Sequence, residues 1–281
     1  MEIERNLTES LIKSFKEHLI LEERSAVTVE KYMRDIRKFI FCTKGELLTK
    51  ERIIAYKKKL QESYAVRSVN SMLAALNSLF AYLGWYELRV KTIKLQQQIY
   101  CPEEKELTKE EYIRLCKTAS KQKNERLNLI LQTICGTGIR VSELQYITLE
   151  AVKKGEMTVS CKAKTRIVFL VEALRKKLLC YARKKGIKKG MIFMTKHGNP
   201  VSRTNIWREM KALCKDAQVN PKKVFPHNLR HLFARVFYGI EKDIAKLADI
   251  LGHSNINTTR IYIVSTGTEH RRRMEKMQLI L

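Results

Sequence analysis

The stretch PHNLRHLFARVFYGI, residues 226–240, combines the pattern of a buried helix with a pair of polar side chains. Its apolar residues recur every three or four positions, which predicts an amphipathic α-helix with one face in a hydrophobic core. His227 and Arg230 are three residues apart, so they share an adjacent face of that helix. Such a pair is by itself more typical of surface decoration or helix capping than of a site. The predicted buried stripe comprises Leu229, Leu232, Phe233, Val236, Phe237 and Ile240.

The sequence after this helix predicts two more short helices with a histidine between them. DIAKLADIL, residues 243–251, has the pattern of an amphipathic helix that ends at the glycine before His253. Asn257 or Thr258 then stands where an N-cap belongs, and we expect the helix that follows to carry Tyr262.

Upstream, GTGIRVSEL, residues 136–144, places Arg140 directly after a glycine turn. We expect a helix to begin there, and the free backbone N–H groups and dipole of a helix N-terminus favour an anion. An ion pair between Arg140 and Glu143 explains the arginine equally well in isolation.

The charge of the chain predicts a polyanionic partner. The 281 residues include 55 Lys and Arg against 29 Asp and Glu, a net charge of +26, and most of the excess lies in residues 101–281. Basic side chains that contact phosphates release condensed counterions, which favours binding. DNA, RNA or an anionic membrane would satisfy this charge, and a basic surface that serves only solubility is the alternative.

Several classes of protein do not fit the sequence. Apolar runs fall short of the roughly 20 residues that span a bilayer, and the N-terminus lacks the pattern of a secretory signal, so we expect a cytoplasmic protein without membrane partners. The seven cysteines are spaced singly, which predicts reduced thiols. We find no carboxylate cluster, HExxH motif or phosphate-binding glycine loop, so we expect neither a metal nor another cofactor.

Helical periodicity over residues 8–84 predicts an all-helical N-terminal domain, which we place at residues 1–90. Thr28, Thr49 and Ser68 stand directly before periodic runs, where N-caps are expected.

Residues 91–106 lose this periodicity and are predicted to form a linker. Thr108 and Glu111 have the spacing of a capping box, which predicts that a second domain begins with a helix, and we place this domain at residues 107–281. Apolar and polar residues alternate over 156–171 on either side of a basic turn, as in a β-hairpin. The expected fold is mainly α with a small β-hairpin.

Four segments together carry a resemblance that none of them carries alone. TGIRVSEL, CKAKTRIVFL, HNLRH and LGHSNINTTRIY follow one another in the order and at the separations of the tyrosine recombinase, or phage integrase, family. The resemblance covers essentially residues 108–265, and the N-terminal helices resemble the core-binding domain of the family. It implies a mixed α/β catalytic domain and a site-specific recombinase that cleaves and rejoins DNA through a covalent 3′-phosphotyrosyl intermediate.

The resemblance also implies the roles of individual residues. Tyr262 would be the nucleophile, and Lys162 would be the hairpin lysine that protonates the departing 5′-hydroxyl. The turn reads Cys-Lys-Ala-Lys and is one residue shorter than the Gly-Lys-Gly pattern of many members, so Lys164 is a rival for this role. The assignment requires converging arginines and a reachable tyrosine hydroxyl. The implied catalytic set is Arg140, Lys162, His227, Arg230, His253 and Tyr262.

This chemistry suits these residue types. Planar guanidinium groups fit the non-bridging oxygens of a phosphate, where negative charge accumulates during attack. A phenol is mostly protonated at neutral pH, so Tyr262 must lose its proton to a neighbour, and its attack stores the broken bond as a phosphotyrosyl ester. The sequence does not separate the roles of the histidines at 227 and 253.

The implied partners are double-stranded recombination sites and further copies of the chain, four in a synaptic complex. Integration, excision, inversion and dimer resolution remain open. So do a non-catalytic DNA-binding regulator and a relaxing enzyme of the type IB topoisomerase kind. The segment after Tyr262 ends in apolar residues that could dock on a neighbouring subunit or pack in cis: Met274, Met277, Leu279 and Ile280.

Overall fold

The structure is a computed structural model in which the chain divides into two compact units, Met1–Gln97 and Gln98–Leu281. Lys162 lies outside the described residues, as do Leu279 and Ile280, and the side chain of Lys164 is not described. The structure describes residues 5–43, 47–94, 103–161, 164–195, 197–262, 271 and 274–277.

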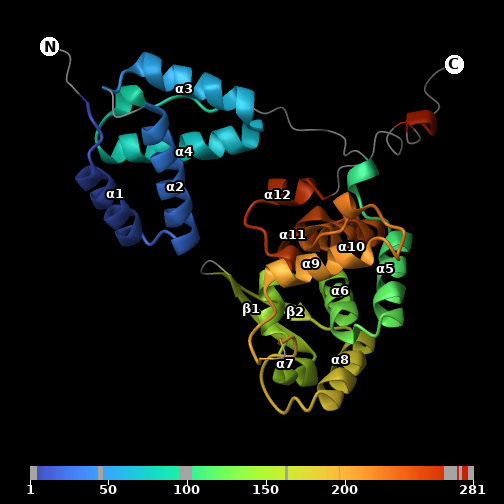
Figure 1. Cartoon of the computed structure of the whole chain (residues 1–281). Helices are drawn as coiled ribbons and strands as arrows, with labels where there is room; N and C mark the ends of the chain where they lie inside the picture. The colour runs from blue at the N-terminus through green and yellow to red at the C-terminus, as the bar shows by residue number, and fades with distance from the viewer. Residues whose placement is uncertain are drawn as a thin grey trace. The chain divides into compact units, whose positions relative to one another are not determined.

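The first unit is helical and packs around its own core (Figure 1). Its elements are α1 (Glu9–Leu21), α2 (Ala26–Thr43), α3 (Lys50–Ser63), α4 (Val66–Tyr82) and the 3₁₀ turn η1 (Tyr86–Leu88). Phe15, Phe39, Ile53, Leu73 and Phe80, which come from all four α-helices, are completely buried. The prediction of an N-terminal helical fold is therefore confirmed.

One of the three predicted N-caps in this unit is confirmed. Thr49 accepts the backbone N–H of Arg52, as an N-cap does. The caps at Thr28 and Ser68 are wrong, because α2 and α4 each begin two residues before them. Ser25 instead accepts the backbone N–H of Thr28.

The second unit contains most of the helices and a two-stranded sheet. Its α-helices and strands are α5 (Lys109–Lys121), α6 (Glu125–Thr137), α7 (Leu149–Lys154), β1 (Glu156–Cys161), β2 (Lys164–Phe169), α8 (Glu172–Lys184), α9 (Arg203–Leu213), α10 (Pro226–Glu241), α11 (Ile244–Leu251) and α12 (Ile256–Arg260). Short 3₁₀ turns are η2 (Glu103–Lys105), η3 (Val141–Tyr146) and η4 (Pro221–Lys223). The mainly α fold with one small hairpin is confirmed.

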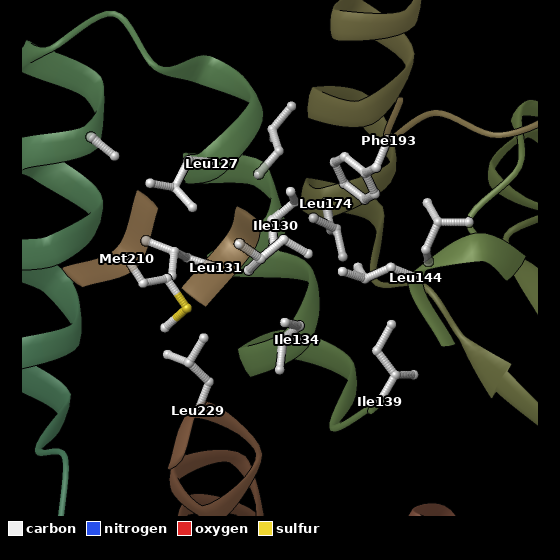
Figure 2. Close-up of a cluster of buried hydrophobic side chains, with 14 of the residues drawn as sticks. Leu127, Ile130, Leu131, Ile134, Ile139, Leu144, Leu174, Phe193, Met210 and Leu229 are labelled. Carbon is white, nitrogen blue, oxygen red and sulfur yellow. The ribbon is translucent and has the colours of Figure 1, made fainter. Parts of the chain in front are cut away.

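Helix α6 lies at the centre of this unit and packs against α5, α8 and α10. Figure 2 shows its Leu127, Ile130, Leu131 and Ile134 among apolar side chains from the surrounding elements, with Leu229 of α10 at one end. The capping box that starts α5 is present, because Thr108 and Glu111 each accept the other's backbone N–H. The packing against α6 fixes the position of α10, which carries His227 and Arg230.

The predicted hairpin is also confirmed. Strands β1 and β2 pair antiparallel, with Met157 opposite Val168 and Val159 opposite Arg166. The first three of these side chains are buried, whereas Ile167 on β2 is exposed. One face of the hairpin therefore lies on the core, as the period of two predicts.

The predicted stripe of α10 is only partly correct. Leu229 and Leu232 are buried, but Val236 and Ile240 are exposed. The reason is that the second half of the helix packs in a smaller cluster with α11, through Ala234 and the partly buried Phe233, Phe237 and Tyr238. A change of packing partner therefore moves the buried face around the helix.

Among the described residues, every helix is too short or too polar to cross a bilayer.

Candidate active site

Arg230 is the largest fully buried side chain of the described residues, with 1% of its surface exposed. Its Nη1 donates to the carbonyl oxygen of Gly138 at 2.6 Å, and its Nη2 donates to that of Leu251 at 2.7 Å. These carbonyls lie at the C-terminal ends of α6 and α11, where helix dipoles favour a cation. The two helix ends therefore hold the guanidinium from two sides.

The Nε of Arg230 is buried and has no hydrogen-bond acceptor among the residues that the structure describes. A buried charged donor without an acceptor is costly, so an anion that supplied one would be bound favourably. Burial and then the neighbouring charge of Arg140 lower the pKa of Arg230 to about 10. Two guanidinium groups are thus held close enough to repel each other, which further favours an anion between them.

Glycine is required at the end of α6. Gly138 has a positive φ of 67°, and a Cβ there would lie 2.4 Å from the ring of Phe233. The glycine turn that the sequence predicts here is therefore what places the carbonyl oxygen against Arg230.

Arg140 lies just past this turn and is the N-cap of η3, so the element that begins there is a 3₁₀ turn and not the expected α-helix. Its Nη1 donates to Glu143 at 3.0 Å, and its backbone N–H donates to the same carboxylate at 2.8 Å. About a third of its side chain, 35%, remains exposed. The ion pair with Glu143 is therefore real, and it leaves part of the guanidinium free to contact a ligand.

His253 follows Gly252, the glycine that ends α11 in the left-handed conformation, as expected. Its Nε2 lies 3.0 Å from Nη2 of Arg230, and its Nδ1 lies 2.8 Å from Oγ1 of Thr259. Arginine only donates, so Nε2 accepts and Nδ1 carries the proton in this arrangement. Burial and then the charges of Arg230 and Arg140 lower the pKa of His253 to about 4, so the ring is neutral at pH 7.

Tyr262 lies two residues beyond α12, whose N-cap is Asn255. The predicted caps at Asn257 and Thr258 are wrong because the Asn255 side chain accepts the backbone N–H of Asn257, two residues after the cap. Tyr262 is 5% exposed, and its phenol group interacts electrostatically with Arg230, whose pKa it raises against the effect of burial. Its ring thus packs like a core residue, stacked at 5.4 Å between centroids on the His253 ring that contacts Arg230.

Two histidines of α10 pack against Tyr262. The centroid of the Tyr262 ring is 5.7 Å from that of His227 and 4.3 Å from that of His231. His227 is exposed at the surface, and partial desolvation followed by the charges of Arg230, Arg140 and Arg203 lowers its pKa. His227 is therefore the member of this group that an approaching ligand can reach first.

His231 also belongs to this cluster, although its place in the sequence did not by itself predict a role. Burial and then the charges of His227, Arg230 and Arg235 lower its pKa to about 4. The spacing from His227 was a usable signal, since residues four apart lie on the same face of a helix.

The structure thus brings together five of the six predicted site residues: Arg140, His227, Arg230, His253 and Tyr262. They come from four places in the chain: the turn after α6, the start of α10, the turn after α11 and the residues after α12. Lys162 cannot be placed, because it lies outside the described residues. The backbone of Lys164 pairs with Cys161 at the end of the hairpin.

A buried tyrosine near a guanidinium group and neutral histidines is a set of groups suited to attack on a phosphodiester through a phosphotyrosine. The family profile described as "Phage integrase family" matches residues 105–269, and that of "Phage integrase, N-terminal SAM-like domain" matches residues 12–87. The first match covers more than half of the chain. The protein belongs to the phage integrase family of tyrosine recombinases.

Curated relatives match the chain over nearly its full length. The chain is 29% identical to tyrosine recombinase XerA of Pyrococcus furiosus, over 99% of this chain and 97% of that protein. It is 27% identical to tyrosine recombinase XerD of Listeria monocytogenes, over 90% of this chain and 93% of that protein.

Solved structures share the fold at lower identity. A crystal structure of XerA recombinase has a TM-score of 0.55 at 24% identity and covers 98% of this chain and 100% of that one. A lambda integrase dimer bound to a COC′ core site has a TM-score of 0.73 at 16% identity and covers 92% of this chain and 77% of that one.

Proposed function

We propose that this protein is a site-specific DNA recombinase that cleaves and rejoins duplex DNA through a covalent link between Tyr262 and a 3′-phosphate. The observation that carries the proposal is the packing of the Tyr262 ring against His253, which itself contacts Arg230, a buried arginine whose Nε has no described acceptor. This arrangement supports the proposal, because a scissile phosphate bound by a fixed cation would lie near a tyrosine that can act as the nucleophile. Membership of the tyrosine recombinase family supports the same function.

In the proposed reaction, the Tyr262 oxygen attacks phosphorus and forms a new phosphate ester as the bond to the 5′-oxygen breaks. Lys162 supplies the proton to that oxygen, with Lys164 as the alternative. Arg140 and Arg230 bind the non-bridging oxygens, each worth roughly 3 kcal/mol in the transition state by analogy with other fixed donors. A 5′-hydroxyl of a second strand reverses the step, so rejoining needs no nucleotide hydrolysis.

The histidines have separate tasks in this proposal. His227 is exposed and near the Tyr262 ring, which suits it to accept the phenolic proton or to contact the phosphate. His253 presents an acceptor nitrogen to Arg230, and in this state it orients the guanidinium. It becomes a donor to phosphate only if Arg230 shifts and the proton moves to Nε2.

We propose that the substrates are double-stranded recombination sites and that the chain works as a homo-oligomer, a tetramer in the synaptic complex. The solved relatives include XerH bound to difH substrate before cleavage and a lambda integrase tetramer on a Holliday junction. Because its substrate is the genomic or mobile-element DNA of the cell, the protein should act in the cytoplasm.

A DNA-binding regulator without catalysis is the second candidate, and the burial of Tyr262 is the observation that favours it. A residue that is 5% exposed can serve as packing alone. DNA must therefore open a path to the Tyr262 hydroxyl if the first proposal is correct.

One experiment separates the two functions. Genomic fragments that the protein joins covalently are captured and sequenced to define the site, and a nicked duplex of that site is then incubated with the protein. The recombinase forms a protein–DNA adduct that survives denaturation, and Tyr262→Phe abolishes it while binding remains. An adduct with Tyr262→Phe refutes the role of Tyr262, and salt-sensitive binding without any adduct supports the regulator.

A further inference from the structure

Arg166 occupies a position on β2 where the strand pattern calls for an apolar residue. It lies opposite the buried Val159 and two residues before the buried Val168, whereas its neighbour Ile167 is exposed. Only 13% of the Arg166 side chain is exposed. A buried cation is costly unless it is paired, so this arginine needs a partner on the inward side of the hairpin.

That partner is Glu143 of η3. Nη1 of Arg166 donates to Oε1 of Glu143 at 3.1 Å, and Nη2 donates to Oε2 at 2.7 Å. The two bonds form the bidentate geometry that arginine and carboxylate favour. Burial would raise the pKa of the Glu143 carboxyl, but hydrogen bonds from Arg166 and from the backbone of Arg140 outweigh it and lower the pKa.

The same carboxylate also holds Arg140. Oε1 of Glu143 accepts Nη1 of Arg140 at 3.0 Å, and Oε2 accepts the Arg140 backbone N–H at 2.8 Å. One buried carboxylate therefore serves two guanidinium groups, and the group of three carries a net positive charge. Arg166 makes the bidentate pair, while Arg140 contributes a single side-chain bond and keeps a partly exposed guanidinium.

Arg166 also touches the turn that presents His253. A Cβ at Gly252 would lie 2.9 Å from both Cδ and Nη1 of Arg166, so the arginine lies directly against that glycine. The Arg166 side chain thus connects the hairpin to the start of η3, where Arg140 lies, and to the end of α11, which precedes His253.

We propose that Arg166 is a positioning residue that acts as the counterion of Glu143 and thereby leaves Arg140 free to bind the scissile phosphate. This inference rests on the proposed function. Without Arg166, Glu143 would form its bidentate pair with Arg140, and the carboxylate would compete with the phosphate for that guanidinium.

The test is a double-mutant cycle of Arg166→Met and Glu143→Gln, with single-turnover cleavage measured on the nicked duplex. Arg166→Met should slow cleavage about tenfold or more, because one fixed cation is diverted from the transition state. The double variant should cleave several-fold faster than Arg166→Met, because the neutral amide introduced by Glu143→Gln does not compete with the phosphate for Arg140. A merely structural role predicts the opposite order, since the double variant lacks more of the network.

A second substrate gives an independent readout. A methylphosphonate at the scissile position removes the negative charge that Arg140 binds, so the defect of Arg166→Met should shrink on this DNA. The matched control is Arg126→Met, which breaks a partly buried pair with Glu209 at the opposite end of α6. It should lower the melting temperature without changing the cleavage rate well below that temperature.

The outcomes distinguish this inference from the proposed function. If the wild-type protein forms the adduct but Arg166→Met cleaves normally, or the double variant is slower than Arg166→Met, the role of Arg166 is wrong and the function stands. If the wild type forms no adduct, inorganic sulfate is titrated and followed by the imidazole NMR signals of His227 and His253. Sulfate affinity should then fall in Arg166→Met and recover in the double variant, and unchanged affinity overturns the inference.

Discussion

Individual residues in this site are held by contacts that composition and periodicity do not reveal. The three-residue spacing of His227 and Arg230 predicts that they share a helix face, but it places them at the edge of the core. Arg230 is instead completely buried, because carbonyl oxygens from two distant helix ends accept its N–H groups. Hydrophobic periodicity predicts that an arginine is exposed, so the burial of Arg230 can be recognised only from the structure.

The contact between His231 and Tyr262 predicts that His231 supports the orientation of the tyrosine. The His231 ring is the histidine ring nearest to Tyr262, with 4.3 Å between centroids, and it is neutral at physiological pH. His231→Ala should therefore slow adduct formation about tenfold, because an unsupported nucleophile loses its orientation. His231→Phe should retain most of the rate if packing is the function of the ring. Equal loss in both variants would show that a ring nitrogen is needed.

The neutral histidines predict how stability depends on pH. His231 and His253 have pKa values lowered to about 4, against about 6.5 in an unfolded chain, so the unfolded state binds more protons between these values. Their contribution to stability is complete above pH 6.5 and falls as the pH drops toward 4. Thermal unfolding followed from pH 7.5 to 4 should show this loss, and His253→Gln should flatten it. A profile that His253→Gln leaves unchanged would contradict the assignment.

At the scale of elements, the ends of the helices build the site more than their lengths do. The helices, the hairpin and the capping box follow from periodicity and local turn chemistry, so they were predictable. The 3₁₀ form of η3 and the N-cap at Asn255 were not, because neighbouring candidate caps compete and tertiary contacts select one. The predicted buried face of α10 is correct only for its first half, because α11 packs against the second half.

Gly138 tests the role of a helix end. Gly138→Ala introduces a Cβ at a positive φ and against Phe233, so we expect a loss of about 1–3 kcal/mol in the free energy of unfolding. Cleavage should also fall, because the displaced carbonyl oxygen binds Arg230. Gly136→Ala is the control, since it lies inside α6 with open space around a Cβ and should be neutral or stabilising. Equal effects of the two substitutions in unfolding assays would contradict this account.

On the scale of the whole molecule, the site joins segments that lie more than a hundred residues apart in the chain. The four motifs in order were sufficient to predict the family and five residues that the fold brings together. The ion pair of Glu143 with Arg166 could not be predicted from the sequence. The inward position of Arg166 on its strand can be explained only once its buried partner, Glu143, is known. The basic charge of +26 agrees with a DNA partner but does not select the reaction.

In the proposed reaction the Tyr262 oxygen becomes bonded to DNA. The most direct measurement is mass spectrometry of the peptide that remains attached to a nucleotide after the trapped adduct is digested with protease and nuclease. We predict a single modified peptide that carries a 3′-nucleotide phosphate on Tyr262. Attachment to another residue, or to a 5′-phosphate, would contradict the account.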